Sequence, residues 1–332
     1  MLDKLKKPFQ ILVSLAIGLG LLYLIIGYSD INGIVATFSR LSLWWIGLFL
    51  FISFLIDLTL ALRWYIILRF QGYKLPFFTI MGYRIMGSSV SYITPGARVG
   101  GEAVRALMLK RQGIPSAEGF SSVILDKSLE LTTYIFFGAI GMLMVLLTFN
   151  VPKITYGLML AAFLITVYLV FKFFSKLKYE QKIFRRLAEI FHLSRLRFVK
   201  KMFKSFDDIE NSMSSFMQHS MKGFMIAILM SGILWILMFG EYWVVLRMLG
   251  YNATIVETFL IGVFIGISFL IPVPAALGVQ EGGQVSLFKL LGKSGSAGMV
   301  FSLIIRGRDI LRTFIGLWLL SHFGVSLLGN SK

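Results

Sequence analysis

Long apolar stretches, separated by short polar segments, run along almost the whole chain. The core of a bilayer is about 30 Å thick, so a helix needs about 20 mostly apolar residues to span it. Stretches near or above this length predict spanning helices at Phe9–Gly27, Ser42–Ile67, Ser116–Phe149, Ile154–Phe171, Gly223–Leu249 and Gly298–Leu327. The pattern predicts an all-α polytopic membrane protein with about six full transmembrane helices.

Two further apolar regions are interrupted by helix-breaking residues. The first consists of Phe77–Ile93 and Glu102–Gln112, and the second is Ile255–Leu291. Their pieces are too short to span, which favours two re-entrant helical hairpins. The structural or hinge residues expected at the two breaks are Pro95, Gly100, Gly101, Pro272, Pro274 and Gly278.

The same spaced set of residues occurs twice, 179 positions apart. Gly87, Pro95, Glu102, Gly113, Lys127 and Glu130 recur as Gly266, Pro274, Glu281, Gly292, Arg306 and Asp309. This internal duplication divides a single transmembrane domain, 1–332, into repeat A (43–149), a basic segment (172–222) and repeat B (223–328). Duplicated halves with broken apolar helices are typical of transporters and mark their binding sites.

Basic residues predict the orientation, because cytoplasmic loops are enriched in Lys and Arg. Segment 172–222 holds twelve Lys or Arg against five Asp or Glu and is therefore expected in the cytoplasm, together with both chain termini. The first hairpin then enters from the cytoplasm and the second from outside. Opposed hairpins predict an inverted-topology repeat, tips that meet near the bilayer midplane, and alternating access.

Within the basic segment, Ile183, Phe184, Leu187, Ile190 and Phe191 share one helical face. Two interpretations remain open. The helix packs on the bundle, or it lies on the anionic leaflet of the membrane.

The amino-acid composition also indicates a protein that is embedded in a membrane. Hydrophobic residues make up 57% of the 332 positions, and the mean hydropathy is +0.81. The net charge of +17 is accounted for by the loops, so we expect no nucleic-acid partner,. Cysteine is absent and three histidines are scattered, so we expect no metal site and no cofactor,.

Ionised side chains also occur inside the apolar segments, where each costs about 2.5–3.5 kcal/mol on insertion scales. They are Arg98, Glu102, Arg105, Asp126, Lys127, Glu130, Glu281, Arg306, Arg308, Asp309 and Arg312. Lys127 with Glu130, and Arg306 with Asp309, are spaced i, i+3 and are predicted to pair. Such charges either fix helix register or line a polar cavity. For the duplicated set, the cavity is favoured.

Glu102 follows Gly100 and Gly101 at the predicted start of a short helix. Its carboxylate either caps the positive helix end or leaves the free amides, with Arg98 or Arg105, to receive a phosphate.

Three motifs resemble those of the lysylphosphatidylglycerol synthase transmembrane region family. They are Thr94-Pro95-Gly96-Ala97-Arg98-Val99-Gly100-Gly101-Glu102-Ala103-Val104-Arg105, Pro272-x-Pro274-x-x-x-Gly278-x-x-Glu281-Gly282 and Arg306-x-Arg308-Asp309. The resemblance covers about residues 10–328 and implies a flippase-like protein, similar to the flippase half of the bacterial multiple peptide resistance factor. A soluble synthase domain, as in fused members, is not expected. Arg105 corresponds to Gln284, so the two halves differ in charge.

We therefore expect a non-enzymatic lipid flippase in the plasma membrane, moving a phospholipid or polyprenyl-linked lipid with a charged headgroup. The expected substrate-binding residues are Arg98, Glu102, Arg105, Lys127, Glu130, Glu281, Arg306 and Asp309. Homo-oligomerisation stays open. Two alternatives are an integral-membrane enzyme that acts on a lipid phosphate or glycolipid, using Glu102 and Glu281 as acid and base, and a non-transporting partner of a separate lipid synthase or glycosyltransferase.

Overall fold

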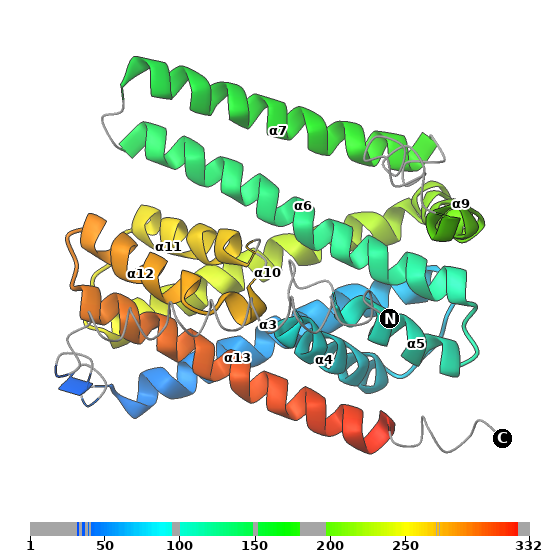
Figure 1. Cartoon of the computed structure of the whole chain (residues 1–332), viewed down its shortest axis with the longest axis horizontal. Coiled ribbons are helices and arrows are strands. Elements are labelled where there is room, and N and C mark those ends of the chain that lie inside the picture. Colours follow the sequence, from blue (N-terminus) through cyan, green and yellow to red (C-terminus); the bar gives the residue numbers. More distant parts are fainter. Residues whose placement is uncertain are drawn as a thin grey trace. The chain divides into compact units, whose positions relative to one another are not determined.

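The computed structural model of the chain describes residues 41–94, 100–148, 152–179, 197–269, 271 and 273–324, with isolated positions at 32, 35, 36 and 39. The described residues form helices joined by turns, with no β-strand among them. The α-helices are α3 (Leu43–Phe70), α4 (Phe77–Ile93), α5 (Gly101–Arg111), α6 (Ser116–Thr148), α7 (Lys153–Tyr179), α9 (Arg197–His219), α10 (Met221–Met248), α11 (Ile255–Ser268), α12 (Val279–Leu290) and α13 (Gly295–Gly324). A short 3-10 turn, η2 (Pro274–Ala276), precedes α12. Figure 1 shows the arrangement of the helices. The all-α prediction is confirmed.

The breaks predicted from Pro and Gly are present in the helices. Helix α4 stops before Thr94 and α5 begins at Gly101, while α11 stops at Ser268 and α12 begins at Val279. The predicted helix Phe9–Gly27, and the predicted breakers Pro95 and Pro272, lie outside the described residues.

Among the described residues, two helices are long and apolar enough to cross a membrane, namely α3 and α10. Each has 28 residues. They are the first helices of repeats A and B. Length and composition thus indicate a span at the same place in each repeat, and the remaining predicted spans and the re-entrant course of the hairpins stay predictions.

The duplication extends to backbone geometry at the ends of these two helices. After α3, Gly72 has φ +95°, and the Tyr73 N–H donates to Leu68 O at 3.0 Å. After α10, Gly250 has φ +82°, and Tyr251 makes the equivalent bond to Leu246 O at 3.0 Å. Both ends are Schellman motifs, which need a left-handed residue that glycine adopts without steric cost.

Beyond the first of these turns, the Tyr73 hydroxyl donates to Glu118 at the start of α6. Burial and this neighbouring carboxylate raise the pKa of Tyr73 to about 12, because both disfavour a phenolate,.

The helices form two compact units. Unit 1 takes in the chain up to Leu58, Gly82–Val104 and the chain from Leu234 on, and unit 2 takes in Thr59–Met81 and Arg105–Ile233. The unit boundaries fall inside α3, α4, α5 and α10, so these four helices contribute to both. The core of unit 1 includes Phe49, Tyr242, Ile261, Phe288 and Phe301, and that of unit 2 includes Ile67, Leu125, Leu129, Met213 and Phe216.

Helix α9, in the predicted basic segment, packs against α6 (Figure 1). Its apolar side chains Ile209, Met213 and Phe216 are buried in the core of unit 2 with Leu125 of α6. This face of α9 is therefore used inside the protein. The apolar face predicted at 183–191 lies outside the described residues, so both interpretations of it stay open.

Helix α7 lies along α6 and presents large apolar side chains outward (Figure 1). Ile154, Leu158, Leu164, Ile165 and Phe171 are all exposed. An apolar face of this extent is unfavourable in water and fits a lipid surrounding.

Candidate substrate-binding charge clusters

A buried ion pair joins α12 to α13 in unit 1. Arg306 of α13 donates from Nε to Glu281 Oε1, and the exposed fraction of Glu281 is 0%. The other oxygen, Oε2, accepts the Gly278 N–H at 2.8 Å and thereby caps α12,. Glu281 thus caps its helix, which is one of the two alternatives that the sequence offered for its counterpart Glu102, and it also pairs with a cation.

The same guanidinium contacts the broken part of repeat B and the end of α4 in repeat A. Arg306 Nη1 donates to Ala275 O in η2 at 3.2 Å and to the Tyr92 hydroxyl, near the end of α4, at 3.1 Å. Ala275 and Ala276 have φ of +53° and +50°, a conformation that costs an L-residue about 1–2 kcal/mol,. Arg306 therefore satisfies a carbonyl in a strained turn of repeat B and also holds the end of α4 in repeat A.

Asp309 attracts Arg306 electrostatically, as the i, i+3 spacing predicts, but its close ion pairs are with other arginines. Arg306 pairs with Glu281, while Asp309 Oδ1 accepts from Arg308 Nη2 at 2.9 Å and lies 3.6 Å from Arg312 Nη1. The physical reason is that α12 brings a buried carboxylate to Arg306 from another helix, which i, i+3 spacing does not anticipate.

The cluster continues to two carboxylates that the sequence analysis overlooked. Arg308 pairs with Glu241 of α10, and Arg312 Nε donates to Asp57 Oδ2 of α3 at 2.8 Å. An alternating row of carboxylates and guanidiniums thus links α3, α13 and α10. The available signal was an ionised residue in the middle of each apolar span.

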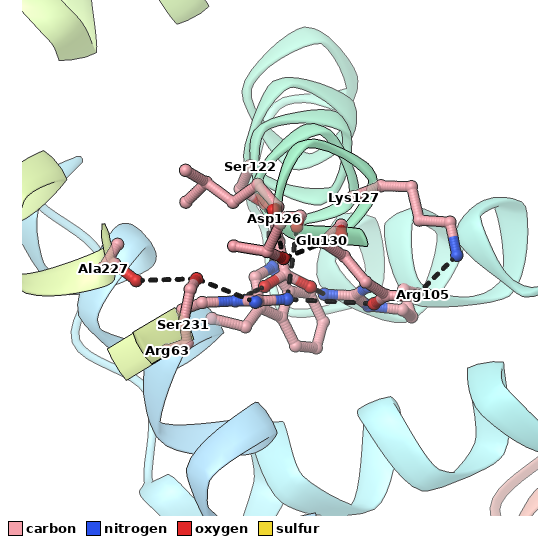
Figure 2. A network of polar contacts seen from close by, with 11 residues as sticks. Arg63, Arg105, Ser122, Asp126, Lys127, Glu130, Ala227 and Ser231 are labelled. Carbon is pink, nitrogen blue, oxygen red and sulfur yellow. Dashed lines mark hydrogen bonds and ion pairs between the residues drawn. The ribbon is translucent and has the colours of Figure 1, made fainter. Parts of the chain in front are cut away.

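In unit 2, one carboxylate holds two arginines (Figure 2). Asp126 Oδ1 accepts from Arg63 Nε at 2.7 Å, and Oδ2 accepts from Arg105 Nη2 at 2.8 Å. Asp126 is 0% exposed and Arg63 is 1% exposed. Arg63 also donates to Ser231 Oγ at 3.1 Å. Arg63 was likewise overlooked in α3, although it carries the same signal as Asp57.

Further contacts extend this cluster, and Arg63 Nη2 also lies 3.8 Å from Glu130 Oε2. Arg105 lies over the Trp64 ring, 4.0 Å from its centroid, in a cation–π geometry,. The predicted pair between Lys127 and Glu130 is confirmed, with Nζ and Oε1 2.9 Å apart (Figure 2).

The start of α5 packs closely against α4 in unit 1. The Gly101 N–H donates to Ser91 Oγ at 2.8 Å, and a Cβ at this position would overlap Gly87 O. Glu102 stands in the first turn of α5 and is partly exposed. At the break of repeat A, Gly100 forms the turn before α5, and Arg98 lies outside the described residues. At the break of repeat B, Pro274 begins η2 and Gly278 is the N-cap of α12.

The predicted binding residues thus fall into two sets. Glu102, Glu281, Arg306 and Asp309 belong to unit 1, and Arg105, Lys127 and Glu130 belong to unit 2. Within these sets, Glu281 forms an ion pair with Arg306, and Lys127 forms one with Glu130.

The apolar first helices, the outward-facing apolar side chains and the buried ion pairs define a helical membrane protein. Its family follows from comparison. The profile of the lysylphosphatidylglycerol synthase TM region matches residues 11–316, so the chain belongs to that family.

Relatives described as UPF0104 membrane proteins occur in three archaea. The chain is 31% identical over 114 residues to one from Methanocaldococcus jannaschii and 29% identical over 117 residues to one from Methanothermobacter thermautotrophicus. These alignments span about a third of each chain, 34% and 35% respectively. A third relative, from Pyrococcus horikoshii, is 26% identical over 200 residues, or 59% of each chain.

Proposed function

We propose that this protein is a flippase, which moves a phospholipid or a polyprenyl-linked lipid across the membrane by passing its charged headgroup through a polar site between the two repeats. Membership of a family named for the membrane region of a lipid synthase supports a lipid substrate. The duplicated broken helices support transport rather than a purely structural role,.

The observation that carries the proposal is the position of Arg306. Its guanidinium contacts Glu281, the Ala275 carbonyl and the Tyr92 hydroxyl, and so lies where the broken part of repeat B meets the end of α4. Broken helices at a repeat interface are where transporters place their substrate sites. A guanidinium is also the side chain best matched to a phosphate, because its donors form a planar fork.

Binding would proceed by exchange of partners. A buried arginine that loses its carboxylate without replacement costs about 3–5 kcal/mol, whereas a lipid phosphate supplies a new charged acceptor. Arg98, Arg105 and Lys127 would make further phosphate contacts. The carboxylates of Glu102, Glu130, Glu281 and Asp309 would orient these cations or meet a cationic headgroup. The lipid tails would remain in the bilayer.

The proposal includes the site of action. Transport would take place in the plasma membrane with both termini in the cytoplasm, without covalent chemistry on the lipid. One repeat would rock against the other to expose the headgroup site alternately to each side.

The test is a translocation assay with the full chain in sealed vesicles that contain a headgroup-accessible fluorescent phospholipid. Arg306→Gln is expected to abolish translocation. Tyr92→Phe, which removes only the hydroxyl on Arg306, is expected to slow it by about tenfold or more, as for one lost hydrogen bond to a charged group. Tyr156→Phe on exposed α7 is the matched control and is expected to translocate at the wild-type rate. Wild-type translocation by Arg306→Gln would refute the proposal.

A further inference from the structure

Three buried polar groups on α12 and α13 have no hydrogen-bond partner among the residues that the structure describes. They are Gln280 Nε2, Gln284 Oε1 and Ser302 Oγ. The exposed fractions of these residues are 1%, 0% and 0%. A buried unsatisfied group is costly, and native proteins retain few of them, so each requires an explanation.

The packing of the two helices places the three groups beside Arg306. A Cβ on Gly298 of α13 would lie 2.7 Å from Gln284 O of α12, and Arg306, two turns further along α13, reaches Glu281. Ser302 lies one turn from Gly298 and one turn from Arg306, so it is flanked by these two contacts. Gln280 precedes Gln284 by one turn and shares its face. The seam formed by Gln280, Gln284 and Ser302 is therefore continuous with the Arg306 pair.

The orientation of one amide is fixed by its own contact. Gln284 Nε2 donates to Ile261 O of α11 at 3.3 Å, which leaves Oε1 as the unpartnered acceptor. Gln280 Nε2 is an unpartnered donor, and the Ser302 hydroxyl can donate or accept,. The seam thus offers both a donor and an acceptor, and neither is charged.

This combination selects the chemistry of a ligand. A phosphate oxygen only accepts and would leave Gln284 Oε1 unsatisfied, while an ammonium only donates and would leave Gln280 Nε2 unsatisfied. A hydroxyl group donates and accepts, and a group with several hydroxyls can satisfy all three side chains. The neighbouring guanidinium of Arg306 would bind a phosphate attached to that group.

We propose that Gln280, Gln284 and Ser302 form a hydroxyl-recognition subsite for a neutral polyol or glycosyl headgroup, next to the phosphate position at Arg306. The inference rests on the proposed function in that it assigns a substrate class to the same site. It also accounts for the charge difference between the repeats, since Arg105 of repeat A corresponds to the neutral Gln284 of repeat B.

The experiment measures binding of short-chain lipids to the full chain in detergent. Dioctanoyl phosphatidylinositol supplies a phosphate with a polyol, and dioctanoyl phosphatidic acid supplies the phosphate alone. The wild type is expected to bind the inositol lipid about tenfold more tightly, since several hydrogen bonds to buried groups distinguish the two lipids. In Gln284→Leu and Ser302→Ala this preference should fall below about threefold while binding of phosphatidic acid is kept.

The control is Ser286→Ala on the same helix, where the hydroxyl is exposed and donates to Gly282 O. It should keep the full preference. Equal binding of the two lipids by the wild type would overturn the subsite.

A melting measurement without lipid excludes a structural role. An unsatisfied hydroxyl contributes no stability, so Ser302→Ala is expected to melt at or above the wild-type temperature. A lower melting temperature with an unchanged lipid preference would mean that the seam holds structural water, and would overturn the proposal. A translocation assay distinguishes a failure of the flippase proposal from a failure of the subsite proposal. A wild type that prefers the inositol lipid but translocates no lipid would refute the flippase and leave the subsite standing.

Discussion

Asp126 is the residue on which the charge balance of unit 2 depends most directly, because one carboxylate serves two buried guanidiniums. Arg63 approaches one oxygen and Arg105 the other, so neither oxygen is left for solvent. The carboxylate of Asp126 therefore offsets the free-energy cost of burying both arginines. Without this carboxylate, that cost is no longer offset for either arginine.

Replacing Asp126 by Asn therefore tests whether this cluster holds the fold. The variant keeps the size of the side chain but leaves Arg63 and Arg105 without their shared counter-charge. We expect a loss of about 3–5 kcal/mol, seen as a lower melting temperature of the detergent-solubilised protein. Asp208→Asn, on the exposed part of α9, is the control and should change stability by about 0.5 kcal/mol or less,. Identical melting of the two variants would mean that the cluster contributes no stability.

At the scale of elements, the close packing of α4 and α5 depends on the absence of a side chain at Gly101. The start of α5 lies so near Gly87 O that a methyl group would overlap it, and Ser91 Oγ would lie 2.6 Å away. Gly82, in the middle of α4, is different, since nothing lies within 4 Å of an added Cβ.

The two glycines give opposite expectations for the same substitution. Gly101→Ala should push α5 away from α4 and cost about 1–3 kcal/mol or more, as overpacking does. Gly82→Ala should be neutral or stabilise α4 by up to about 1 kcal/mol through helix propensity. Thermal melting of both variants checks the order. A Gly101→Ala protein that melts at or above the wild-type temperature would rule out the close contact.

Much of this element structure could be predicted from the sequence. The segment Phe77–Ile93 coincides with α4, because Pro76 precedes it and Thr94-Pro95 follows it. Helix α7 was predicted to end at Phe171 but continues to Tyr179. Apolarity marks the part of a helix that lies in lipid, whereas helical hydrogen bonding continues through polar residues such as Lys172.

The partners of the charged residues could not be predicted in the same way. Helical spacing predicted the contact of Lys127 with Glu130, because the two residues are three positions apart on one helix. The pairing of Arg306 with Glu281 joins two helices, and that of Arg63 with Asp126 joins residues 63 positions apart. Such contacts depend on how helices pack, and a single sequence carries no direct signal of that packing.

At the scale of the whole molecule, the repeats have the same order of elements. Helices α3, α4, α5 and α6 correspond to α10, α11, α12 and α13, and the turns after α3 and α10 share their hydrogen bonds. Opposite orientation of these repeats in the membrane remains a prediction from the distribution of basic residues.

Cysteine labelling tests that prediction, and the chain is suited to it because it contains no native cysteine. Cysteines placed at the exposed positions Asn252 and Ser294 should react with an impermeant thiol reagent added outside cells. Those at Lys74 and Gln112, exposed at the corresponding turns of repeat A, should react only after the cytoplasmic side is opened. Labelling of both pairs from one side would refute the inverted arrangement.

The ion pair between Asp57 and Arg312 has a consequence for how the chain is made. Its partners lie 255 residues apart, in the first and last of the described helices. At a synthesis rate of about 5–20 residues per second, α3 leaves the ribosome about 13–50 s before α13 exists. During that interval Arg312 is absent, so it cannot pair with Asp57. Glu241, which accepts a hydrogen bond from Ser53, is also made later than α3. The newly made α3 must therefore wait in a setting that tolerates a carboxyl group, such as a wet insertion channel or a chaperone groove, before it can enter lipid as part of the finished protein.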